Sequence, residues 1–202
     1  MKVIEQLLVN AGISPIAGVD EAGRGACAGP LVIASVVLND PFAAELAVVR
    51  DSKEIPESKR DAIFDLIHSV AASVSVVIVP AAEVDSRGVH AANLDGMRRA
   101  VQGLSIEPAY VLTDGYAIEG LGVPNLAVWK GDQVVVSISA ASVIAKVTRD
   151  RIMRELDAEF PQYGFAGHKG YITAAHTKAL NEHGPCAEHR TSFANVAALI
   201  HK

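Results

Sequence analysis

Four acidic side chains stand where short apolar segments of the chain end. Asp20 and Glu21 close an apolar run and precede a glycine-rich loop, Asp114 closes a second run within a Thr-Asp-Gly turn, and Asp132 lies just ahead of a small-residue segment. Each acid alone is commonly a solvated turn residue or a helix cap. Two acidic strand ends can meet at one edge of a sheet, which predicts that Asp20 and Glu21 lie near Asp114, whereas Asp132 taken alone reads as a solvated loop acid.

Clustered carboxylates suit oxygen-preferring divalent cations, because Mg²⁺ takes few protein ligands and completes its coordination with water and substrate phosphate. Two such ions can activate an attacking water and stabilise the leaving oxygen of a phosphodiester displacement. The chemistry requires no protein nucleophile. We therefore expect two Mg²⁺ or Mn²⁺ ions as cofactors.

The charge balance argues against a generally basic nucleic-acid binder. The formal net charge is -5, whereas phosphate affinity comes mostly from clustered Lys and Arg. A local basic groove can still bind phosphates, and carboxylates neutralised by metal no longer repel them. The charge lowers the affinity that we expect without excluding cleavage.

The elements that would position these acids alternate along the chain. Apolar, β-branched runs predict strands at residues 16–20, 31–38, 73–79, 109–113 and 125–129. Helical spacing predicts helices after Pro56, at 91–104, from about 137–142 to Pro161, and at 173–182 and 193–200. Without a repeat or linker, this pattern predicts one α/β domain over residues 1–202.

The first residues and the cysteines bear on where the protein works. Glu5 and Gln6 fall inside what would be the apolar core of a signal peptide, and no apolar run reaches membrane-spanning length. Cys27 and Cys186 are too few and too far apart for a disulfide framework. We expect a cytoplasmic monomer with reduced thiols and no membrane contact.

A possible zinc site around Cys186 has a weak basis. His183 and His189 flank this cysteine, but three residues supply no fourth ligand and lack zinc-finger spacing. The acids therefore remain the expected metal ligands.

Several motifs, in one order from about residue 16 to 193, resemble those of bacterial type 2 ribonuclease H. They are Asp20-Glu21-Ala22-Gly23-Arg24-Gly25 with Ala28-Gly29-Pro30, Asp51-Ser52-Lys53, Asp114-Gly115, Ser139-Ala140-Ala141-Ser142 continuing to Asp150, His168-Lys169-Gly170-Tyr171, His176, and Gly184-Pro185 with His189-Arg190-Thr191-Ser192-Phe193. Arg24 in place of lysine, and the short segment before Ile16, favour type 2 over type 3.

The resemblance implies a ribonuclease H-like fold, with a mixed central sheet flanked by helices and a helical C-terminal part at about 161–202. It also implies that the metal ligands are Asp20, Glu21, Asp114 and Asp132, with Asp20 bridging both ions. The implied substrates are RNA/DNA hybrids and duplex DNA containing single ribonucleotides. Cleavage would fall on the 5′ side of the ribonucleotide and leave 3′-hydroxyl and 5′-phosphate ends, as in the first step of ribonucleotide excision.

The resemblance also assigns the substrate contacts. Gly23, Arg24 and Gly25 would surround the ribose 2′-hydroxyl, the group that distinguishes RNA from DNA, because glycine backbone can approach it closely. Tyr171 would stack on the next sugar, although its turn also suits a buried aromatic plug. The expected phosphate contacts are Lys53, Lys146, Lys169 and Arg190. Residues 149–151 are expected to form a solvated or ion-paired helical face.

Two other classes of function fit part of this pattern. A nucleotidyl transferase or junction resolvase can use clustered acids on the same fold, but the loop at residues 23–25 together with Tyr171 would have no 2′-hydroxyl to read. A duplex-binding module with merely solvated acids would bind without metal and would not cut.

Overall fold

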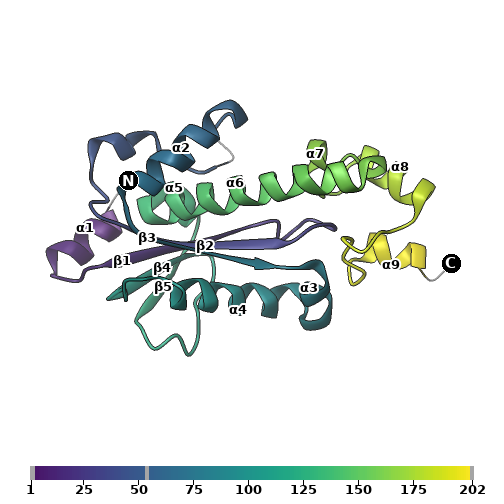
Figure 1. The fold of residues 1–202 in the computed structure, drawn as a ribbon. Helices are drawn as coiled ribbons and strands as arrows, with labels where there is room; N and C mark the ends of the chain where they lie inside the picture. Colours follow the sequence, from purple (N-terminus) through teal and green to yellow (C-terminus); the bar gives the residue numbers. More distant parts are fainter. Residues whose placement is uncertain (1–2, 53–54, 201–202) are drawn as a thin grey trace.

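A mixed five-stranded sheet with helices on both faces forms the body of the protein (Figure 1). The computed structural model describes residues 3–52 and 55–200. The strands are β1 (Ile16–Ala22), β2 (Leu31–Leu38), β3 (Ala71–Val79), β4 (Tyr110–Asp114) and β5 (Asn125–Val128). The helices are α1 (Val3–Asn10), α2 (Glu57–Val70), α3 (Ala81–Arg87), α4 (Val89–Gln102), α5 (Gly131–Val134), α6 (Val136–Glu159), α7 (Phe165–His168), α8 (Ala174–His183) and α9 (Ala194–Ile200), with 3-10 turns at Ala44–Val48 and Pro161–Tyr163.

The sheet has the strand order β3-β2-β1-β4-β5. β1 runs antiparallel to β2 and parallel to β4, and β5 continues the parallel half. The mixed α/β fold predicted from the sequence is therefore confirmed. All five predicted strands exist within two residues of their expected bounds, and residues 31–38 match β2 at both ends.

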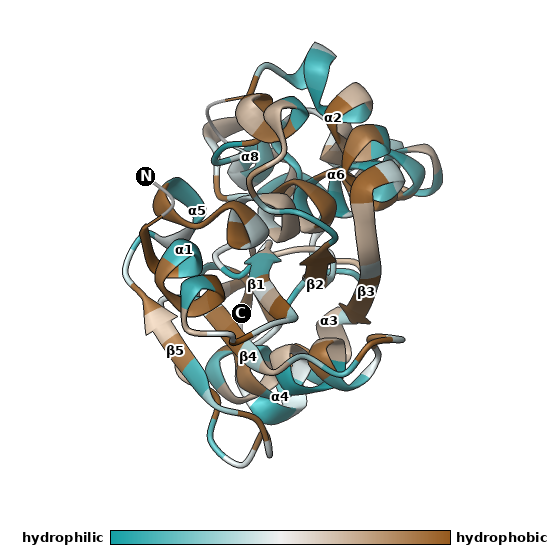
Figure 2. Cartoon of the chain, turned by 90° about the vertical axis from the view of Figure 1, so that its left-hand side faces the viewer, coloured by the Kyte–Doolittle hydropathy of each residue, from teal (hydrophilic) through white to brown (hydrophobic). Residues whose placement is uncertain are grey.

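Two helical layers cover the sheet. α6 and α2 lie over one face and α3 and α4 over the other (Figures 1 and 2). β2 is buried at every position because it has strands on both sides and helices on both faces. In Figure 2, β1 ends in a hydrophilic arrowhead among hydrophobic neighbours. The end of β1 therefore brings the buried carboxylate of Asp20 next to the apolar core.

The long helix α6 lies unusually close to β1. An added Cβ at Gly18 would collide with the backbone of Ser137 and Ile138, so a larger residue would push the helix from the sheet. Glu5 of α1, which is 1% exposed, accepts hydrogen bonds from the backbone N–H groups of Val136 (2.8 Å) and Ser137 (3.1 Å). Its carboxylate therefore caps the N-terminus of α6.

The segment from Pro161 onward gathers at one end of the sheet, shown in green and yellow in Figure 1. Ala28, in the loop after β1, pairs with His189 of this segment, and Arg190 N donates to Cys27 O at 2.8 Å. The C-terminal helices are thereby tied to the loop that follows Asp20 and Glu21. Within the part of the chain described, no helix has the length and apolarity needed to cross a membrane.

Candidate active site

Three of the four predicted acids meet at one edge of the sheet. Asp20 and Asp114 follow the register pair Val19 and Thr113 on the parallel strands β1 and β4, so both carboxylates leave the sheet at the same level. Asp132 approaches from α5. Carboxylate oxygens of the three residues lie within 4.8 Å of one another, the one such group of potential metal ligands in residues 3–52 and 55–200.

Backbone contacts hold this cluster in place. Gly131 N donates to Asp114 Oδ1 at 2.8 Å, which joins the turn before α5 to the end of β4. Ser139 Oγ donates to the carbonyl of Asp132 at 2.7 Å, joining the same turn to α6. Asp132 is 3% exposed and Asp20 is 5% exposed. The acids therefore belong to a packed scaffold.

The electrostatics of the cluster favour a cation. Burial raises the pKa of the Asp20 carboxyl well above its usual range, and the charges of Glu21 and Asp114 raise it further. Hydrogen bonds from Ser142 and from Glu21 N (2.7 Å) oppose this shift. Divalent cations would relieve the repulsion, and a donor set of carboxylate oxygens fits Mg²⁺ or Mn²⁺ better than a soft metal.

Two adjoining cavities of about 550 and 520 Å³ surround the cluster. They share Glu21 and Arg24, and Glu21 lies outside the 4.8 Å group of three. The first is lined by Asp20, Glu21, Ala22, Gly23, Arg24, Gly25, Ser52, Arg60, Ser142, Lys146 and Tyr171. The second is lined by Glu21, Arg24, Asp51, Asp114, Gly115, Tyr116, Trp129, Lys130, Asp132 and Gln133. Together they form a groove with the acids at its centre.

Two buried arginines shape the glycine-rich loop. Arg149 of α6 donates to the carbonyls of Pro30 (2.8 Å), Ala28 (3.0 Å) and Lys169 (2.8 Å). Arg190 donates to the carbonyl of Gly29 through Nε (3.1 Å) and Nη2 (2.9 Å), and to that of Arg24 at 3.3 Å. Both side chains are 0% exposed. Their guanidinium groups therefore satisfy loop carbonyls that would otherwise be buried without donors.

These positions correct two sequence predictions. Arg149 was expected on a solvated or ion-paired helical face, which is wrong, although its neighbours Asp150 and Arg151 do form ion pairs. Arg190 was expected to contact phosphate, but its complete burial against the loop rules out that role in this structure. Burial, followed by the nearby charge of Arg149, lowers the pKa of Arg190 to about 10, so it remains charged at neutral pH.

Tyr171 stands beside the loop as an exposed ring. Its side chain is 39% exposed, which excludes the buried-plug alternative. A Cβ built on Gly25 would lie 4.0 Å from Tyr171 Cε1, and the guanidinium carbon of Arg149 lies 5.5 Å from the ring centroid. The first cavity therefore presents glycine backbone and an aromatic face to the same space.

A chain of buried histidines fixes the backbone of Tyr171. Cys186 N donates to His189 Nδ1 at 3.0 Å, the two Nε2 atoms of His189 and His176 are 3.0 Å apart, and His176 Nδ1 lies 3.0 Å from the carbonyl of Tyr171. Because the carbonyl only accepts, the assigned tautomers place protons on His176 Nδ1 and His189 Nε2. Both rings are therefore neutral, and burial lowers the pKa of each.

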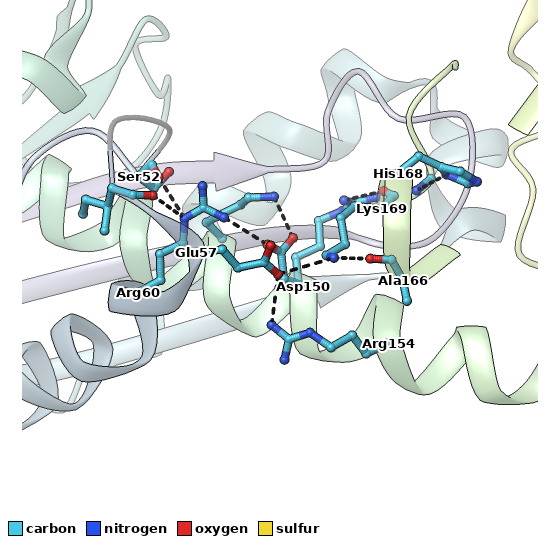
Figure 3. A network of polar contacts seen from close by, with 12 residues as sticks. Ser52, Glu57, Arg60, Asp150, Arg154, Ala166, His168 and Lys169 are labelled. Carbon is cyan, nitrogen blue, oxygen red and sulfur yellow. Dashed lines mark hydrogen bonds and ion pairs between the residues drawn. The ribbon is translucent and has the colours of Figure 1, made fainter. Parts of the chain in front are cut away.

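Two of the predicted lysines, Lys146 and Lys169, take part in polar contacts beside the first cavity, and Figure 3 shows Lys169 among them. Lys146 pairs with Asp150 at 2.6 Å, and Arg60 reaches the same carboxylate at 3.6 Å. Lys169 contacts Glu57 at 3.6 Å and also donates to the carbonyl of Ala166. Arg60 is a cavity-lining cation that the sequence analysis missed, because nothing distinguishes it from an ordinary helix-surface arginine. Lys53 lies outside the described residues.

Comparisons with known proteins agree on one family. A profile described as Ribonuclease HII matches residues 17–196. The chain is 58% identical over 192 residues to ribonuclease HII of Acidothermus cellulolyticus, covering 95% of this chain and 62% of that protein. It is 56% identical over 195 residues to ribonuclease HII of a Parafrankia species, covering 96% and 81%. The chain therefore spans less than two thirds of the first relative and about four fifths of the second.

Solved structures with the same fold include archaeal proteins. Ribonuclease H2 from Pyrococcus horikoshii superposes with a TM-score of 0.79 at 26% identity, covering 91% of this chain and 96% of that one. Ribonuclease HII from Archaeoglobus fulgidus, solved in a complex with PCNA, also gives 0.79 at 25% identity, covering 89% and 95%. Each similarity extends over about nine tenths of this chain.

Proposed function

The chain belongs to the ribonuclease HII family of metal-dependent endonucleases, and on that premise we propose what it cuts and how. Its substrates are the RNA strand of RNA/DNA hybrids and single ribonucleotides embedded in duplex DNA. It cuts on the 5′ side of the ribonucleotide and leaves 3′-hydroxyl and 5′-phosphate ends. It works as a monomer in the cytoplasm.

The acids at the groove centre hold the metal. Asp20, Asp114 and Asp132 supply clustered carboxylate oxygens, and Glu21, which lines both cavities, is the proposed fourth ligand. Two bound Mg²⁺ or Mn²⁺ ions would supply Lewis-acid stabilisation of the attacking and leaving oxygens. The chain's own part is to keep these carboxylates together, with Ser142 and Glu21 N orienting Asp20.

The loop at residues 23–25 selects a ribonucleotide over a deoxyribonucleotide. Gly25 leaves backbone open to the sugar, Gly23 lets the loop pack on Arg149, and the exposed ring of Tyr171 faces the same cavity. A 2′-hydroxyl can hydrogen-bond to that backbone, whereas a deoxyribose leaves those polar groups unpaired. The observation that carries the proposal is this juxtaposition: a carboxylate cluster opens directly onto a glycine-backbone slot with an aromatic wall.

Cations on the same side position the duplex. Lys146 and Arg60 line the first cavity, and Lys169 lies in the adjoining network. Lys146 and Arg60 share the carboxylate of Asp150 and Lys169 pairs with the exposed Glu57, so one of the first two cations can turn toward a phosphate while the other stays with the buried Asp150. Such contacts hold the backbone without reading sequence.

The test is cleavage of four labelled duplexes, three of which differ only at one central position. The central nucleotide is a deoxyribonucleotide, a ribonucleotide or a 2′-O-methyl ribonucleotide, and the fourth duplex is an RNA/DNA hybrid. Each is incubated with Mg²⁺, Mn²⁺ or chelator, and the product ends are mapped. We expect one metal-dependent cut 5′ of the ribonucleotide, cutting along the hybrid, and no cut in the other two duplexes.

The alternatives predict different gels. A junction resolvase would cut an all-DNA branched substrate and ignore the single ribonucleotide. A duplex-binding module would retard every duplex with or without metal and would cut none. Either pattern would overturn the proposal.

A further inference from the structure

Trp129 is the most exposed large apolar side chain of the described residues, with 82% of its surface accessible. It is also the only tryptophan in the chain. It lines the second cavity together with Asp114 and Asp132. An indole carries a large apolar face that water solvates poorly, and tryptophan is enriched where proteins bind partners. A single exposed apolar residue elsewhere on the surface would need no explanation. An exposed tryptophan at the rim of the metal-binding groove indicates a binding role.

The backbone beneath Trp129 is fixed relative to the metal ligands. Val128 is the register partner of Asp114 in the β4–β5 pair, and Gly115 N donates to Val128 O at 3.1 Å. On the other side, Gly131 N donates to Asp114 Oδ1. Val128 and Gly131, which flank Trp129 and Lys130, are thus both hydrogen-bonded to the turn at Asp114 and Gly115. The indole is exposed, but the backbone that carries it is fixed.

Lys130 adopts a left-handed conformation, with φ of 52°. Residues other than glycine rarely take this conformation and pay a strain of about 1–3 kcal/mol when they do. The conformation lets Gly131 N reach Asp114 while Trp129 and Lys130 both remain exposed at the rim. Aromatic rings and cations occur together where proteins bind nucleic acids, the cations along the phosphate backbone and the rings against the nucleotides.

The two cavities place one aromatic ring on each side of the acid cluster. Tyr171 lines the first and Trp129 the second, and the cavities meet at Glu21 and Arg24. A strand that crosses the acid cluster would therefore meet one aromatic ring on each side. The indole is 82% exposed, so its face is available to a ligand.

We propose that Trp129 is a substrate-binding residue whose indole packs against a sugar of the duplex across the metal site from Tyr171, while Lys130 contacts an adjoining phosphate. This inference rests on the proposed function, because it takes the groove to be the substrate path. Paired bases inside a duplex cannot stack on a protein ring, so the sugar face is the chemistry that the indole meets. The contact requires no 2′-hydroxyl and so adds affinity for every duplex.

The first test uses tryptophan emission, which in this chain reports on one position only. Wild-type protein in chelator is titrated with all-DNA duplex and with the single-ribonucleotide duplex, and anisotropy of a label on the duplex gives saturation independently. We expect both duplexes to quench or shift the emission in step with the anisotropy. Unchanged emission at saturation would overturn the proposal.

The second test compares Trp129→Ala and Trp129→Phe with Leu126→Ala. Leu126 is a matched control, because it is 43% exposed on β5, the strand that Trp129 follows, but does not line either cavity. We expect Trp129→Ala to bind both duplexes about tenfold more weakly, Trp129→Phe to recover most of the loss, and the control to bind as wild type. All three variants should melt normally, since the side chains are exposed.

Cleavage kinetics separate this inference from the proposed function. Trp129→Ala should lower kcat/KM by about the same tenfold and leave kcat at saturating duplex within about twofold of wild type. Wild-type affinity in Trp129→Ala, or an equal loss in Leu126→Ala, would contradict the contact. A wild-type protein that bound duplexes but cut none would instead contradict the proposed function, and the emission result would stand.

Discussion

The side chain of Arg149 occupies the space that a side chain at Gly23 would need. A Cβ built on Gly23 would collide with the Nε, Cδ and Cζ atoms of Arg149, and Gly23 has a φ of 88°. The glycine therefore meets two requirements at once, since it adopts a conformation unfavourable to other residues and lets a buried guanidinium lie under the loop. Loop conformation and helix α6 are coupled at this contact.

Gly23→Ala should lower the free energy of unfolding by about 2–4 kcal/mol, because backbone strain and overpacking add. Gly12→Ala is the matched control, since Gly12 has a φ of 75° but no atom within 4 Å of its built Cβ. Gly12→Ala should lower the free energy of unfolding only by the backbone strain, about 1 kcal/mol. Urea unfolding of both variants measures the difference, and equal losses would show that Arg149 does not constrain Gly23.

Gly25→Ala should leave stability almost unchanged but lower the rate of cleavage. The added methyl has only Tyr171 Cε1 nearby, at 4.0 Å, so the protein should melt within about 0.5 kcal/mol of wild type. The methyl would, however, stand in the slot where the sugar is proposed to sit. We expect single-turnover cleavage of a lone ribonucleotide to fall at least about tenfold, and wild-type cleavage would remove Gly25 from the recognition loop.

Tyr171→Ala should melt almost as wild type, because the ring is 39% exposed. It should nevertheless cut a lone ribonucleotide in DNA at least about tenfold more slowly, since base and sugar contacts to an aromatic ring contribute about 1–3 kcal/mol each. Tyr171→Phe should retain most of the activity because the ring face supplies the contact. If Tyr171→Phe cut as slowly as Tyr171→Ala, the hydroxyl and not the ring face would supply the substrate contact.

Acid should weaken the histidine chain under Tyr171. Burial and the nearby His176 lower the pKa of His189 from its usual 6.5 to about 4. Between these values the unfolded chain binds a proton that the folded protein excludes, so the free energy of unfolding falls as pH falls, by at most about 3 kcal/mol. The stability is complete above 6.5.

Urea unfolding across that pH window measures the slope, and His189→Gln provides the control. The variant lacks the titrating ring, so its stability should change less with pH even if it is less stable throughout. An unchanged slope would assign the acid sensitivity to other groups, such as carboxylates.

The sequence predicted those parts of the molecule that depend on local pattern. The run at 31–38 forms a buried strand because nearly all of its residues are apolar and many are β-branched. Asp20 and Asp114 converge because parallel strands end at a common edge, and Asp132 joins them from α5. Arg149 could not be predicted to be buried, since its partners are carbonyls about 120 residues away and its neighbours Asp150 and Arg151 are those of a surface helix. The burial of Glu5 could not be predicted for the same reason, because its carboxylate caps a helix more than 130 residues later in the chain.

The placement of the metal-binding acids at the centre of the groove is tested most directly by Asp114→Asn. The amide keeps the shape of the side chain and can still accept from Gly131 N, but it removes one negative charge from the cluster. Single-turnover cleavage of a single-ribonucleotide duplex in saturating Mg²⁺ is measured beside binding of the same duplex in chelator. We predict that cleavage is lost and binding is equal to or tighter than wild type; activity above a few per cent of wild type would contradict the assignment of Asp114 as a metal ligand.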